Sequence, residues 1–232
     1  MQTSSPVRKF SPLGSAEETT YQDNWFDRIC IALFTRQMSK ALGGRTTKRK
    51  GYEGIVDLST KIMQGRNCKQ QQAVVTRILK SIIPAPVRLV VRRFISPNRL
   101  VCELNAWCAA KLFKWLVGPC EVRRVEIVNR SRRPKIQNSN VYIRKCRYLE
   151  SSNCAGMCIN MCKLPTQDFF TRNLGIPLAM RPNFEDFSCE MVFGQVPPPF
   201  ETEASYNQPC LAESETATDG VQRPCPKVRD YT

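Results

Sequence analysis

A run of closely spaced cysteines places the strongest constraint on how this chain can fold. Cys146, Cys154, Cys158 and Cys162 lie within 17 residues, and Cys189 follows 27 residues later. With 12 cysteines in 232 residues, chance would place fewer than one in a stretch of that length. The fold must therefore accommodate several thiols in one small region.

The spacing of three of these cysteines is that of one helical face. On an ideal helix, Cys154, Cys158 and Cys162 would form a stripe that drifts by about 40° per step. A bend at Gly156 would let all three thiols reach one metal ion, whereas a wider cluster would need no bend. The pattern differs from zinc ribbons and is looser than the usual iron–sulfur runs. Metal or redox use is the favoured interpretation, with disulfides and buried core thiols as the alternatives.

The absence of histidine narrows the chemistry further. It excludes Ser-His-Asp and Cys-His catalysis, the zinc-protease helix motif and every histidine-based iron site. A transition metal must then be held by Cys, Asp, Glu, Tyr or Met side chains. The candidate catalytic carboxylates are Asp168 and Glu190, which stands beside Cys189 in a segment that would also fit a solvated turn. The predicted metal ligands are Cys146, Cys154, Cys158, Cys162 and Cys189.

The order of the expected elements predicts an α+β fold. Residues 1–20 are expected to be a leader or flexible arm without the apolar stretch of a secretory signal. Residues 21–119 are expected to form amphipathic helices, and residues 120–199 a small β-sheet with the cysteine-rich metal site. Residues 200–232 are rich in Pro, Glu, Ser and Thr, and we expect a disordered tail there.

Two of the helices carry long apolar stripes. Asp23 and Ser96 are the expected N-caps of these helices, and the second helix is expected to extend to Val117. The first stripe consists of Trp25, Ile29, Leu33 and Met38. The second consists of Leu100, Leu104, Trp107, Leu112 and Trp115. Core packing is the first interpretation of the second stripe, and the wall of an apolar ligand pocket is the alternative.

The later part of the chain has strand-like periodicity on both sides of the cysteine run. Strands are expected at residues 122–128 and 141–145, with a polar turn at 137–140 between them. A second pair is expected at 177–180 and 188–193, with a turn at 181–183. A short helix is predicted from Thr166 to Leu174, with Gly175 as its stop.

The net charge of +15 favours an anionic partner. A solvated basic surface is one interpretation, and peripheral contact with an anionic membrane is the other. The basic residues that motivate membrane contact are Arg77, Lys80, Arg88, Arg92 and Arg93. A nucleic-acid partner is not expected, because the sequence lacks the interleaved aromatic signature of a known module. A spanning helix is not expected either, because no window of 18 uninterrupted apolar residues occurs.

The segments around the cysteines resemble a known family. The sequence reads CRYLESSNCAGMCINMCKLPTQDFF from Cys146 to Phe170, then PNFEDFSCEM from Pro182 to Met191, then FGQVPPP from Phe193 to Pro199. Together they resemble the C-terminal domain of the plant iron-containing β-carotene isomerases, the dwarf-type proteins of strigolactone synthesis. The resemblance is dense over residues 146–199 and looser over roughly 50–145.

The resemblance implies an iron-dependent plastid enzyme that converts all-trans-β-carotene to 9-cis-β-carotene or acts on a close relative. Its cofactor would be iron held by cysteine, either mononuclear or in an iron–sulfur cluster, and a transient exchange of one electron with the polyene would permit rotation. Its substrate would be a carotenoid, with peripheral contact to a plastid membrane and a functional link to the carotenoid cleavage dioxygenases. The alternative on the same cysteines is a non-catalytic iron–sulfur or redox-sensing plastid protein.

Overall fold

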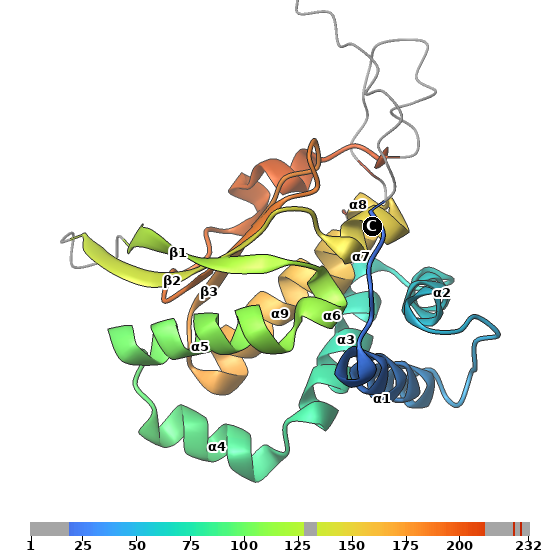
Figure 1. Ribbon diagram of the computed structural model, residues 1–232, viewed down its shortest axis with the longest axis horizontal. Helices are drawn as coiled ribbons and strands as arrows, with labels where there is room; N and C mark the ends of the chain where they lie inside the picture. Colours follow the sequence, from blue (N-terminus) through green and yellow to red (C-terminus); the bar gives the residue numbers. More distant parts are fainter. Residues whose placement is uncertain (1–18, 128–133, 212–224, 226–227, 229–232) are drawn as a thin grey trace, which may run out of the picture.

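The computed structural model describes residues 19–127, 134–211, 225 and 228. Helices from the first half of the chain lie on one side of a four-stranded antiparallel sheet and pack against a helical run from the second half (Figure 1). This arrangement confirms the α+β class. The part of the chain that the structure describes contains no helix that is both long and apolar enough to cross a membrane.

Among the described residues, six helices precede the sheet: α1 (Trp25–Ala41), α2 (Tyr52–Met63), α3 (Cys68–Ile82), α4 (Ala85–Phe94), α5 (Arg99–Leu112) and α6 (Lys114–Val117). Asparagine side chains cap α1, α3 and α5, because Asn24, Asn67 and Asn98 each accept a hydrogen bond from a first-turn backbone N–H. The expected caps Asp23 and Ser96 were therefore wrong by one and two residues. The expected helix from Ser96 to Val117 is divided at Phe113 into α5 and α6.

The expected apolar stripes are present, but most of their members face outward. Met38 and Trp115 are buried, whereas Trp25, Leu33 and Trp107 are 74%, 56% and 56% exposed. Ile29, Leu100, Leu104 and Leu112 are exposed as well. Core packing was therefore the wrong interpretation for most of the second stripe. The buried core lies instead under α2, α3 and the sheet, with Leu58 and Ile62 fully enclosed.

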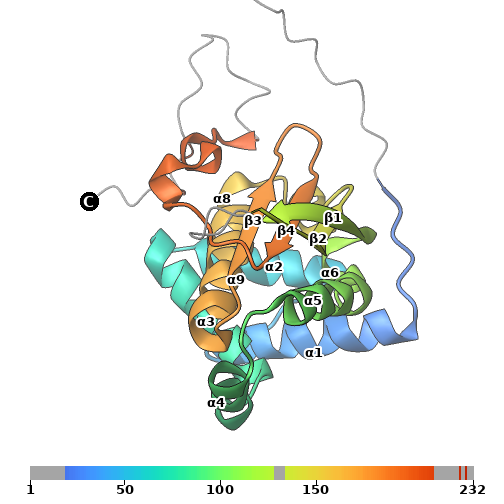
Figure 2. The same cartoon turned by 90° about the vertical axis from the view of Figure 1, so that its left-hand side faces the viewer.

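The sheet has the strand order β1-β2-β4-β3, formed by β1 (Cys120–Ile127), β2 (Lys135–Ile143), β3 (Leu178–Pro182) and β4 (Cys189–Phe193). Helix α5 packs across it (Figure 2). The four strands were predicted, but the turn predicted at 181–183 begins too early, because Arg181 and Pro182 belong to β3. The polar turn predicted at 137–140 was not a turn. Those residues belong to β2, where the Gln137 amide and the Ser139 hydroxyl both donate hydrogen bonds to the Phe193 carbonyl.

Helix α7 (Arg147–Ser152) begins directly after Cys146, and a continuous helical run that contains Cys158 and Cys162 begins directly after Cys154. That run consists of α8 (Ala155–Met157), the π-helical η1 (Cys158–Lys163), α9 (Leu164–Asp168) and the π-helical η2 (Phe169–Leu174). It lies against α3 on one side and β3 on the other. The run ends at Gly175, whose φ of 75° suits glycine. The predicted helix 166–174 is thus the last part of a longer helix, and Thr166 is not its cap.

The chain beyond residue 200 is ordered as far as it is described. Phe200–Thr202 and Ala204–Asn207 form the 3-10 helices η3 and η4, so the predicted disorder does not begin at residue 200. Cys225 and Val228 are buried against Ile159. The rest of the predicted tail, and the predicted leader up to residue 18, lie outside the described residues.

Candidate functional site

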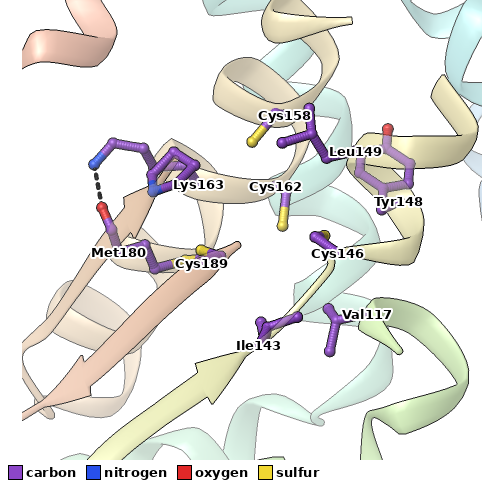
Figure 3. A pocket seen from close by; sticks show the side chains of 11 residues that line it. Val117, Ile143, Cys146, Tyr148, Leu149, Cys158, Cys162, Lys163, Met180 and Cys189 are labelled. Carbon is purple, nitrogen blue, oxygen red and sulfur yellow. Dashed lines mark hydrogen bonds between the residues drawn. The ribbon is translucent and has the colours of Figure 1, made fainter. Parts of the chain in front are cut away.

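Four of the five predicted cysteine ligands line one enclosed cavity of about 10 Å³. Cys158 and Cys162 come from η1, Cys146 lies between β2 and α7, and Cys189 begins β4. Figure 3 shows the sulfur atoms of Cys158 and Cys162 directed from the helix toward Cys146 and Cys189. The other lining residues are Val117, Ile143, Tyr148, Leu149, Lys163, Met180 and Pro182. Residues that are 43 positions apart in sequence therefore meet at one place.

The sheet fixes two of these cysteines beside each other. Cys189 pairs with Ile143 across β2 and β4, which places it next to the end of the strand that leads to Cys146. The Cys146 N–H donates to the Phe187 carbonyl over 2.7 Å. Phe187 itself has a φ of 61°, which is rare for a bulky residue. Such backbone strain gathers at functional sites, because the surrounding structure must hold it in place.

The π-helical geometry of η1 presents the other two cysteines. A π-helical segment within an α-helix marks functional sites with unusual frequency. Here the segment begins at Cys158 and includes Cys162, so that both side chains face the cavity. The predicted bend at Gly156 is not needed, because the change of helical type begins two residues later.

Burial holds these thiols in their neutral form. It raises the pKa of Cys162 to about 12, with a further contribution from the nearby Cys146. Burial likewise raises the pKa of Cys158 and of Cys189, and their neighbouring cysteines raise it further. Several thiolates could share this space only with a compensating positive charge.

One such charge is already present in Lys163, whose side chain is 1% exposed. Its Nζ donates to the Gln167 Oε1 over 3.0 Å and to the Met180 carbonyl over 2.6 Å, and it pairs with the Glu203 carboxylate at 2.5 Å. The same Gln167 oxygen accepts from the Met180 N–H, which ties the helix to β3. The ammonium group lowers the pKa of Cys158 and of Cys189, against the larger effect of burial. Sequence reasoning missed Lys163, and its only signal was its place directly after Cys162.

The donor set fits thiolate-ligated iron. Soft thiolates are the usual protein ligands of iron–sulfur clusters and of iron held without histidine. Among the described residues, no three His, Cys, Asp or Glu side chains are already arranged to hold one metal ion. The four thiols therefore share a cavity without forming a finished site, and metal binding would have to draw them together.

The remaining predicted site residues lie away from this cavity. Cys154 is the N-cap of α8 and is not among the residues that line it. Asp168 is paired with Arg172 at 2.8 Å on the surface. Glu190 accepts a hydrogen bond from the Asn140 amide and faces the opposite side of β4 from Cys189. The structure thus brings neither candidate catalytic carboxylate to the cysteines.

A second and much larger cavity adjoins the first. This groove has a volume of about 510 Å³ and is bounded by α1, α2, α3, the α5–α6 junction, Tyr148 and the helical run. Cys162 and Tyr148 line both the groove and the cysteine cavity. The Tyr148 hydroxyl donates to the Ser59 Oγ over 2.9 Å, and burial raises its pKa. Leu112 and Trp115, from the second apolar stripe, line the groove.

The C-terminal part of the chain matches a known family model. Residues 115–202 match the model described as "Beta-carotene isomerase D27-like, C-terminal". A Medicago truncatula protein named "Beta-carotene isomerase D27, chloroplastic" is 42% identical over 190 residues, which cover 82% of this chain and 73% of the relative. The chain belongs to the β-carotene isomerase D27 family. This confirms the resemblance that the cysteine segments suggested.

A second relative agrees with that assignment. An Arabidopsis thaliana protein of the same name is 36% identical over 198 residues, covering 85% of this chain and 73% of the relative. No solved structure matches the chain. All residues that line the cysteine cavity lie within the span matched by the family model.

Proposed function

We propose that this chain isomerises a carotenoid double bond between cis and trans, converting all-trans-β-carotene to 9-cis-β-carotene or acting on a close relative. Membership of the D27 family and the names of both relatives support this reaction. The observation that carries the proposal is the composition of the cysteine cavity. It has four thiols and, among the described residues, no carboxylate. Such a lining suits a bound metal ion that exchanges an electron with the substrate.

The energetics of rotation explain why the reaction needs electronic help. A turnover of about one per second corresponds to a barrier of about 17 kcal/mol. Rotation about a peptide bond, which is only partly double, has a barrier of about 18–20 kcal/mol. The enzyme must therefore reduce the bond order of a carbon–carbon double bond to roughly that of an amide C–N bond during the rotation.

The chain's own residues prepare the site for that task. Cys146, Cys158, Cys162 and Cys189 would hold the iron, which when bound supplies a one-electron redox partner. Lys163, although paired with the Glu203 carboxylate, favours the thiolate form of Cys158 and Cys189 by lowering their pKa. Leu149 and Ile143, both almost fully buried, keep water from the cavity. Exclusion of water would limit side reactions at the metal site.

Iron retention and isomer analysis test the proposal together. Anaerobically purified protein should contain iron, and the Cys158→Ser variant should lose most of it together with the isomerase activity. Cys108→Ser, at a half-buried position outside the cavity, is the matched control and should keep both. Iron that is retained without any change in the cis/trans ratio of carotene would favour the alternative, a non-catalytic iron–sulfur or redox-sensing protein.

A plastid location completes the proposal. Both relatives are named chloroplastic, and carotenoids are the substrates that their names specify. The 9-cis product would feed the carotenoid cleavage dioxygenases, and through them the synthesis of strigolactones or other apocarotenoids. The iron would be mononuclear or part of a cluster bound to the four cavity thiols.

Helix α4 is the proposed contact with the plastid membrane. In the described structure none of its residues is buried. It exposes Leu89 and Phe94 together with Arg92 and Arg93, which is the composition of an interfacial helix. Arg88 has a different role, because its guanidinium donates to the Lys80 and Ile83 carbonyls at the end of α3.

Vesicle flotation tests this contact. The double variant Arg92→Glu/Arg93→Glu should bind vesicles that contain anionic lipid much more weakly, and salt should weaken the binding of the unmodified chain. Arg124→Glu/Lys135→Glu changes the same charge at exposed positions on the sheet and should bind as the unmodified chain does. Equal binding by both double variants would assign the basic residues of α4 to a solvated surface.

A further inference from the structure

The groove beside the cysteine cavity has the lining of a hydrocarbon site. At about 510 Å³ it falls within the range of small-molecule pockets. Among the described residues, no Asp, Glu, Lys or Arg lines it, although the chain as a whole carries 55 charged side chains of these four types. A ligand with a formal charge would therefore find no partner there.

Three polar side chains that line the groove, those of Ser59, Ser81 and Tyr148, form hydrogen bonds within the protein. The Ser59 Oγ accepts the hydrogen bond of the Tyr148 hydroxyl. The Ser81 hydroxyl donates to the Ile78 carbonyl over 2.6 Å. With these groups occupied and no charged residue in the described lining, binding in the groove depends mainly on apolar contact and shape.

The inner wall of the groove is also a wall of the cysteine cavity. Only Tyr148 and Cys162 line both spaces, among the residues that the structure describes. A ligand that fills the groove would lie against the side chain of a candidate iron ligand. This adjacency favours a ligand that reacts at the cysteine site over an unrelated one.

The outer rim of the groove faces solvent with apolar side chains. Leu33, Ile82, Leu112 and Phe113 line the groove and are 56%, 50%, 49% and 45% exposed. Helix α4, the proposed membrane contact, directly follows Ile82 and Ile83 in the chain. A ligand dissolved in lipid could therefore enter across the rim without crossing water.

We propose that this groove is the binding site of a long, uncharged, conjugated isoprenoid, which enters across the rim and places a double bond against the wall formed by Tyr148 and Cys162. The inference rests on the proposed isomerase function and identifies the groove as the place where the substrate binds. Trp115, inside the groove, packs edge-on against Phe34 and lies within reach of a bound polyene. Its fluorescence provides a signal that is independent of catalysis.

The test is binding of detergent-solubilised all-trans-β-carotene, followed by quenching of tryptophan fluorescence. Leu33→Asp and Leu112→Asp place a carboxylate on the rim, and each should weaken binding about tenfold or more. Ile29→Asp and Leu100→Asp are matched controls on the same two helices, exposed and outside the groove. They should bind as the unmodified chain does. Because all four side chains are already exposed, none of the four changes should unfold the protein.

The outcomes separate this inference from the proposed function. The Cys158→Ser variant should still bind β-carotene when it no longer isomerises it, so binding without turnover leaves the groove assignment intact. Rim variants that bind as tightly as their controls would overturn the assignment, whatever the isomerase activity. Palmitate should not displace the carotene, and displacement at equal concentration would overturn the claim that the ligand is uncharged.

Discussion

The helical half of the molecule exposes apolar side chains, whereas the cysteine-bearing half buries charged and polar ones. Trp107 on α5 is 56% exposed, while Lys163 on η1 is 1% exposed and surrounded by three acceptors. Arg147 is also buried, between Asp23 and the ring of Tyr52. Each half thus departs from the usual distribution of residues, in opposite directions.

The difference reflects two tasks. Buried charge in the cysteine half fixes the helical run against β3, so its removal should cost folding free energy. Exposed apolar surface in the helical half contributes little to folding and is available for lipid or for a hydrocarbon ligand. The groove lies where the two halves meet, with its rim on the helices and its wall at Cys162.

The largest effect is expected from loss of the buried ammonium. Lys163→Met leaves the Glu203 carboxylate, the Gln167 oxygen and the Met180 carbonyl without their common donor. We expect the free energy of unfolding to fall by about 3–5 kcal/mol, measured by urea denaturation. Arg172→Ala breaks an exposed ion pair with Asp168, and the free energy of unfolding should change by about 1 kcal/mol or less.

A double variant distinguishes the loss of the ion pair from a general packing defect. Lys163→Met/Glu203→Gln removes both partners of the ion pair and should recover part of the lost stability. If the free energy of unfolding of Lys163→Met lies within about 1 kcal/mol of that of the unmodified chain, the buried charge does not stabilise this half of the molecule.

A smaller effect on stability is expected from Glu150 on α7, whose stabilising contribution should be lost at acidic pH. Burial raises the pKa of this carboxyl group, but hydrogen bonds from Lys145, Tyr21 and the Thr19 N–H outweigh it and lower the pKa overall. A group with a lowered folded pKa stabilises the protein above its unfolded pKa, near 4.3, and that stability is lost as pH falls through the folded value.

The Glu150→Gln variant should therefore be less stable than the unmodified chain at pH 7, and the difference should shrink below about pH 4. Paired urea denaturations at the two pH values measure this. A difference that is the same at both would show that the effect of Glu150 comes from packing and not from its charge.

The smallest effect is expected from Trp107. Trp107→Ser removes a large exposed ring, and we expect the free energy of unfolding to change by less than about 0.5 kcal/mol. Val141→Ala, at a position on β2 that is 1% exposed, is the contrasting change and should cost about 1 kcal/mol or more. A large loss on removal of Trp107 would mean that its ring is part of the core and that the contrast between the halves is wrong.

Sequence reasoning found which residues share a face but not always what covers that face. The period of Leu100, Leu104 and Trp107 correctly placed them together on α5. Periodicity is the same for a face against the core and a face against lipid, so their exposure could not be predicted. Strand alternation, in contrast, could have shown that Glu190 points away from Cys189, because neighbours on a strand face opposite sides.

The candidate site was also predictable only in part. Cysteine density and spacing led to Cys146, Cys158, Cys162 and Cys189, which the structure brings together. Cys154 has the same spacing, but it precedes the helical run and follows Asn153, whose φ of 40° breaks the helix. The groove could not be predicted, because its walls come from helices far apart in the sequence whose packing the local pattern does not encode.

The most direct test of the account is an anaerobic incubation of the iron-loaded protein with all-trans-β-carotene or, separately, with the 9-cis isomer. Because isomerisation is reversible, both reactions should approach the same mixture, without cleavage products and without oxygen consumption. Glu190→Gln should behave as the unmodified chain does, because its carboxylate lies outside the cysteine cavity. Apocarotenal products, a strict requirement for oxygen, or loss of activity in Glu190→Gln with iron still bound would contradict an isomerase that works by electron exchange.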